Sequence, residues 1–86
     1  MKERVRMPIS EIALRITNSQ GQDLTVHLEP WGEQYTMAAG ATFKVEAKGP
    51  EGDSLELEYG DGRITVYGWS GSTVAISATD TGAEGS

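Results

Sequence analysis

A two-residue alternation of apolar and polar side chains runs through most of the chain and constrains its fold more than any other feature. Strands with one buried face have this period, whereas an amphipathic helix repeats its apolar residues every three or four positions. No window shows the helical period over three turns. The alternating segments run over residues 12–16, 24–28, 35–37, 43–47, 55–59, 64–66 and 74–78.

Turn-forming residues separate these seven segments, which follow one another at a spacing of roughly ten residues, a pattern typical of a small all-β sandwich or barrel. We therefore predict an antiparallel β-sandwich of about seven short strands, whose in-phase residues form a shared core. Immunoglobulin-like, fibronectin-like and cupredoxin-like strand orders all stay open. Gly60-Asp61-Gly62 predicts a tight hairpin, because an Asp-Gly pair readily adopts positive φ angles.

The chain is long enough for one domain only. Leu, Ile, Val and Phe make up 16 of its 86 residues, so the core is thin. We place the β-sandwich domain at residues 10–79. Residues 1–9 form a basic N-terminal segment that can act as an edge strand through Val5, Met7 and Ile9, since Pro8 restricts it to an edge. Residues 80–86 offer nothing to bury and are predicted to be a disordered tail.

Composition also excludes several classes of protein. The chain has no Cys, which excludes a disulfide scaffold and thiolate chemistry. Its net charge of −6 argues against sequence-independent nucleic-acid binding. The charged N-terminus and the short apolar runs predict a cytoplasmic protein with no membrane association.

The residues that carry chemistry are few. His27 is the single histidine and is expected to face solvent, so a small enzyme centred on His27 is an alternative that we do not favour. One His without Cys cannot supply the ligands of a zinc or copper site, and we predict neither a metal nor a cofactor.

Charge divides the chain. Lys2, Arg4, Arg6 and Arg15 lie in the first fifteen positions, whereas an acidic stretch follows Pro50. We interpret the acidic stretch as a solvated strand face; a bipolar molecule that meets a basic partner is the alternative. Calcium binding is disfavoured, because two of the carboxylates sit on a strand without the looped spacing of a calcium site. The predicted acidic face comprises Asp53, Glu56, Glu58 and Asp61.

Aromatic side chains are the remaining candidates for a binding surface. Tyr67 is out of phase with the core, and Trp31 and Trp69 lie beside turns. Exposed rings of this kind stack sugars or build protein interfaces. The alternative is that a Trp closes an open end of the core.

A longer stretch resembles small uncharacterised bacterial β-sandwich proteins. It comprises Leu28-Glu29-Pro30-Trp31-Gly32-Glu33-Gln34-Tyr35-Thr36-Met37, followed by Ala39-Gly40 and Phe43-Lys44-Val45. The resemblance implies the sandwich fold and no active site. Within it, Pro30 is expected to end a strand and Gly32 to adopt an unusual backbone angle.

We predict a non-enzymatic module that binds another protein, including a second copy of itself, through an edge strand or the region of Trp31, Tyr67 and Trp69. The alternative is a carbohydrate-binding module, which requires these three rings to form one flat exposed strip.

Overall fold

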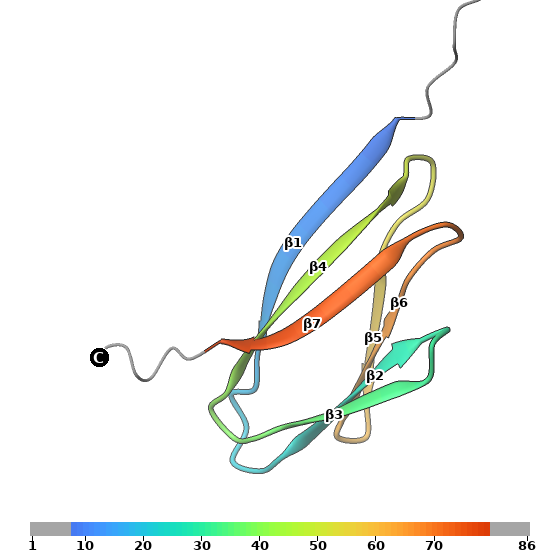
Figure 1. The fold of residues 1–86 in the computed structure, drawn as a ribbon. Coiled ribbons are helices and arrows are strands. Elements are labelled where there is room, and N and C mark those ends of the chain that lie inside the picture. Colours follow the sequence, from blue (N-terminus) through green and yellow to red (C-terminus); the bar gives the residue numbers. More distant parts are fainter. Residues whose placement is uncertain (1–7, 80–86) are drawn as a thin grey trace, which may run out of the picture.

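A computed structural model describes residues 8–79, and its regular structure consists of seven β-strands without a helix (Figure 1). Each alternating segment lies in a strand, apart from Leu55, which precedes its strand by one residue. The all-β prediction is confirmed. The strands are β1 (Ile9–Thr17), β2 (Leu24–Glu29), β3 (Glu33–Met37), β4 (Thr42–Pro50), β5 (Glu56–Gly60), β6 (Arg63–Tyr67) and β7 (Thr73–Thr79).

The predicted segments at the two ends of the chain lie largely outside the described residues. Of the proposed N-terminal edge strand, Val5 and Met7 are outside, whereas Ile9 begins β1. The predicted disordered tail, residues 80–86, is also outside.

The strands form two sheets. The three-stranded sheet has the order β1-β4-β7 and is antiparallel, whereas the four-stranded sheet has the order β3-β2-β6-β5 and contains a parallel pair, β2 with β6. The prediction of two antiparallel sheets is therefore wrong for the larger sheet. Alternation records which face of a strand is buried, but it does not record which strand lies beside it or in which direction.

Two connections are hairpins within the four-stranded sheet, β2 to β3 and β5 to β6, and the other four pass from one sheet to the other. In the β5–β6 turn, Asp61 and Gly62 have φ angles of 50° and 71°. Both central residues of a type I′ turn need positive φ, so the predicted tight hairpin is confirmed. In the β2–β3 connection, Gly32 has a φ of 77°, and Pro30 follows the last residue of β2.

Apolar side chains from both sheets meet in one core. In this core the rings of Tyr35 and Phe43 pack edge to face, with their centroids 6.3 Å apart. Residues of β1 and β7 pack against the cluster and are half-buried. The buried cluster itself consists of Leu24, Val26, Leu28, Met37, Phe43, Val45, Ile64 and Val66.

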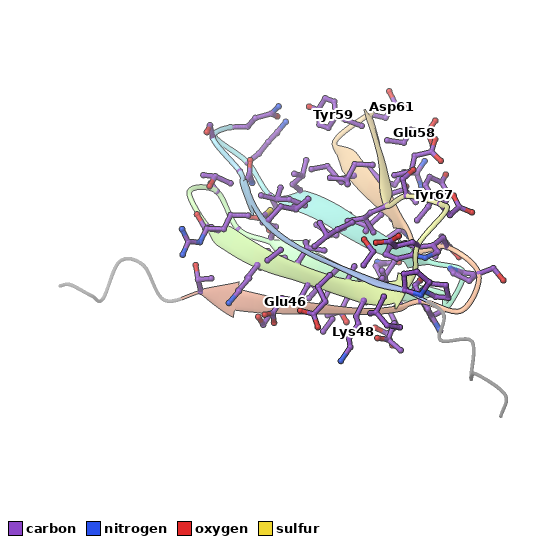
Figure 2. All side chains as sticks on the ribbon, turned by 90° about the horizontal axis from the view of Figure 1, so that it is seen from above. Glu46, Lys48, Glu58, Tyr59, Asp61 and Tyr67 are labelled. Atoms are coloured by element: carbon purple, nitrogen blue, oxygen red, sulfur yellow. The ribbon has the colours of Figure 1, made fainter. Side chains whose placement is uncertain are left out.

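Leu57 and Tyr59 depart from the predicted core. Their partners in β6, Val66 and Ile64, are buried, so both side chains are on the core side of the sheet. They nevertheless stay 41% and 57% exposed. β5 is one of the two edge strands of the larger sheet and lies at the rim of the molecule, where Tyr59 is labelled (Figure 2). The smaller sheet has one strand fewer and leaves this face of β5 uncovered.

A buried polar residue joins two loops at one end of the core. Asn18 is 1% exposed, and its side-chain amide donates to the carbonyls of Met37 and Gln22 at 3.1 and 2.9 Å. Its side-chain oxygen accepts the backbone N–H of Gln20 at 3.0 Å. Asn18 therefore fixes the β1–β2 connection against the end of β3.

Candidate functional site

The outer face of the four-stranded sheet carries three of the predicted site residues, Glu56, Glu58 and Tyr67. The parallel register places His27 beside Thr65 and Glu29 beside Tyr67, and the antiparallel register places Glu58 beside Thr65. Side chains at these paired positions project from the same face of the sheet. Residues far apart in sequence thus meet on one polar surface.

This surface contains a hollow of about 750 Å³, which we call the polar hollow. Trp31 lies beside its rim, because a Cβ on Gly68 would fall 2.6 Å from the indole ring of Trp31. The hollow is lined by His27, Glu29, Pro30, Glu58, Tyr59, Gly60, Asp61, Arg63, Thr65, Tyr67 and Gly68.

Tyr67 and Glu58 are linked across the hollow. The phenol hydroxyl of Tyr67 donates to a carboxylate oxygen of Glu58 at 2.8 Å. This hydrogen bond is the main reason that the pKa of Tyr67 lies above its ordinary value; desolvation and the negative charges of Glu58, Glu56 and Glu29 raise it further. The phenol therefore keeps its proton at neutral pH and serves as a hydrogen-bond donor.

The predicted acidic face is partly assembled here. Glu58 and Asp61 line the hollow, and Glu56 lies two residues before Glu58 in β5, beside Tyr67. Asp53 is apart from them in the β4–β5 connection, where its carboxylate accepts the backbone N–H of Ser54 at 2.8 Å.

Glu29 is the acidic residue that sequence reasoning missed. It lies 27 positions before Glu56 and reaches the same surface only through the parallel pairing of β2 with β6. No signal in the sequence reports that pairing.

Trp69 has a structural position. It is 7% exposed, its indole N–H donates to the carbonyl of Pro50 at 2.7 Å, and its backbone N–H donates to the hydroxyl of Ser72 at 2.9 Å. Its ring is thus covered, with its polar atom already bonded to the protein.

The exposure of the three predicted rings differs. Trp31 is 44% exposed, Tyr67 is half-buried, and Trp69 is buried. The three rings therefore do not form one flat exposed strip, which corrects the geometry expected for a sugar-stacking platform. The interpretation of a Trp closing the core fits Trp69 alone.

The second candidate surface is the free side of β5, here called the β5 edge (residues 56–60). All five of its residues are exposed. Residues that flank a two-residue hairpin turn form a hydrogen-bonded pair, so Gly60, Glu58 and Glu56 bond to β6. The backbone N–H and C=O groups of Leu57 and Tyr59 consequently point away from the sheet. The phenol of Tyr59 accepts a hydrogen bond from the Gln20 side chain at 2.7 Å.

The other sheet edges in residues 8–79 are β1, β3 and β7, and they present less apolar surface. Ile9, at the first position of β1, is the one exposed large aliphatic residue among them. The β5 edge is therefore the described edge that combines free backbone groups with two neighbouring exposed apolar side chains.

His27 was the residue on which an enzyme would depend. It lines the polar hollow, but within residues 8–79 no hydrogen bond joins it to a hydroxyl or a carboxylate. The described residues also contain no group of three or more acidic or His side chains able to hold a metal ion. Neither finding tests whether the protein is an enzyme, and the non-enzymatic assignment stays a prediction.

No protein-family model, curated protein or solved structure matches the chain. Residues 8–79 contain no helix with the length and apolar character needed to cross a membrane.

Proposed function

We propose that the protein is a non-enzymatic β-sandwich module that binds an extended segment of protein chain at the β5 edge, including a segment of its own kind. The observation that carries this proposal is the exposure of both Leu57 and Tyr59 on an edge strand whose outward backbone groups are free within residues 8–79.

Strand addition would use these features together. The outward N–H and C=O groups of Leu57 and Tyr59 supply main-chain hydrogen bonds, and their side chains supply apolar contact. Many proteins protect such an edge with charge, with Pro or with a covering loop. Here Glu56 and Glu58 protect one face of β5, whereas the core-side face keeps its large apolar side chains.

A backbone substitution at Leu57 tests the proposal. Leu57→Pro removes the outward N–H but no hydrogen bond to β6, so the hairpin is retained. Leu57→Ala is the matched control, because it shortens the side chain and keeps the N–H. We expect self-association, followed by sedimentation over a range of concentrations, to weaken at least about tenfold more in Leu57→Pro than in Leu57→Ala. Equal association of the two variants would contradict strand addition.

Carbohydrate binding in the polar hollow is the second candidate function. It is favoured by the exposed ring of Trp31 at the rim and by the hydroxyl, carboxylate and guanidinium groups that line the hollow. The burial of Trp69 weakens it. Titration of sugars with tryptophan fluorescence as the readout, repeated with Trp31→Ala, tests this candidate; an unchanged signal on a broad glycan set would dispose of it.

A further inference from the structure

We propose that the N-terminal segment 2–7 of a second copy is the strand that adds to the β5 edge. This inference rests on the proposed function of that edge and names its partner. It follows from the side-chain pattern of the segment, from the two faces of β5, and from the end of the molecule at which the described chain begins.

The segment and the β5 edge have complementary faces. In Lys2-Glu3-Arg4-Val5-Arg6-Met7, the even positions are all basic and two of the three odd positions are apolar. In β5, the even positions 56 and 58 are acidic and lie on the outer face, whereas Leu57 and Tyr59 lie on the core side. Because a strand exposes alternate residues on opposite faces, one extended segment can match both faces at once.

An antiparallel register achieves this match. With Val5 opposite Leu57, Arg4 lies opposite Glu58 and Arg6 opposite Glu56. Directly opposed side chains share a face in an antiparallel pair, and opposite charges there are stabilising. Val5 then exchanges two backbone hydrogen bonds with Leu57, whose polar backbone groups point outward.

The position of Pro8 favours a second copy over the chain's own segment. The carbonyl of Pro8 accepts the backbone N–H of Glu51 at 3.1 Å, and Ile9 pairs with Pro50, so the described chain begins on the three-stranded sheet, whereas β5 belongs to the four-stranded sheet. Packed sheets lie about 10 Å apart, and an extended residue covers at most about 3.5 Å. If the chain's own segment crossed to β5, the crossing would consume about three of its six residues, which would remove Val5 and Arg6 from the pairing.

The same geometry predicts a closed dimer. β1 begins where β4 ends, and β5 follows after a short connection, so the start of β1 and the start of β5 lie at one end of the molecule (Figure 1). The antiparallel register brings the donor's Met7 to this end of the acceptor. Two copies that meet here can exchange their segments reciprocally about a two-fold axis.

Charge-reversed full-length chains test the exchange. The donor variant carries Arg4→Glu and Arg6→Glu, and the acceptor variant carries Glu56→Arg and Glu58→Arg. Each variant alone opposes like charges, so we expect its dimerisation constant, measured by sedimentation at low salt, to weaken at least about tenfold. In a one-to-one mixture both exchanged strands meet opposite charges, and dimers should return to within a few-fold of the wild-type constant.

Two controls accompany the mixture. Tyr67→Phe removes the hydrogen bond to Glu58, as the acceptor variant does, and should leave dimerisation unchanged. Far-ultraviolet circular dichroism of each variant establishes that it keeps its β-structure, so that a loss of dimers is not a loss of folding.

The outcomes separate this inference from the proposed function. If the mixture dimerises no better than either variant, the segment of a second copy is not the partner. If Leu57→Pro then still weakens wild-type association, the β5 edge stands as a binding site and only its partner is wrong. A wild-type chain that stays monomeric at every concentration would overturn the inference and the self-association part of the proposed function together.

Discussion

Asn18 holds two loops together through contacts that local sequence patterns do not predict. In the sequence it opens a turn-rich stretch, whereas in the structure its amide group bonds to the carbonyl of Gln22 within the β1–β2 connection and to the carbonyl of Met37 at the end of β3. Long-range contacts of one side chain depend on the complete chain path. Sequence reasoning can identify the turn here, but it cannot identify the buried polar residue within it.

Replacement of this amide by a carboxylate should destabilise the protein. Asn18→Asp keeps the size of the side chain but turns an N–H donor into an anion that faces carbonyl oxygens. We expect a loss of about 3 kcal/mol in the free energy of unfolding, measured with urea. Gln20→Ala, in an exposed position, serves as a control and should cost less than about 0.5 kcal/mol. A similar loss in both variants would contradict the role given to Asn18.

The phenol of Tyr67 gives a prediction about pH. Its pKa is raised mainly by the hydrogen bond to Glu58, so the folded protein holds this proton more tightly than the unfolded chain does. The stabilisation from this group is complete below the ordinary tyrosine pKa and is lost as the pH rises through the raised pKa. Glu58→Gln should lower the pKa of Tyr67 toward its ordinary value, as followed by the NMR shifts of the ring. An unchanged titration would show that Glu58 is not the cause.

At the scale of elements, periodicity predicted all seven strands and the β5–β6 turn, because both depend on short-range chemistry. It did not predict the parallel pairing of β2 with β6, nor the exposure of Leu57 and Tyr59. A strand that lies under a neighbouring sheet and one that extends beyond it have the same alternation. The polar hollow was missed for the same reason, since its residues come from separate strands.

The β5–β6 hairpin is the element that presents the proposed edge, and its turn can be tested directly. Gly62→Ala places a Cβ at a φ of 71° and should cost about 1 kcal/mol in the free energy of unfolding. Asp61→Asn is the matched control, because an Asn-Gly pair suits the same turn, and it should be nearly neutral. Thermal or urea unfolding compares the two variants, and a neutral Gly62→Ala would contradict the assigned turn.

At the scale of the whole molecule, the two sheets differ in width and in charge. One strand more in the larger sheet leaves the core side of β5 uncovered. Within residues 8–79 the outer face of that sheet carries Glu29, Glu56 and Glu58 against Arg63 alone. Three of the seven basic residues lie in segment 2–7. The uneven charge in the sequence therefore places basic residues in segment 2–7 and acidic residues on β5, the two partners of the proposed exchange.

Residue-resolved amide hydrogen exchange at the β5 edge tests the account most directly. Added strands would bond the outward N–H groups of Leu57 and Tyr59, whereas the N–H of Glu58 already faces β6. We predict that exchange at Leu57 and Tyr59 slows at least about tenfold between dilute and concentrated protein, with little change at Glu58. Exchange at Leu57 and Tyr59 that is equally fast at every concentration would contradict strand addition at β5.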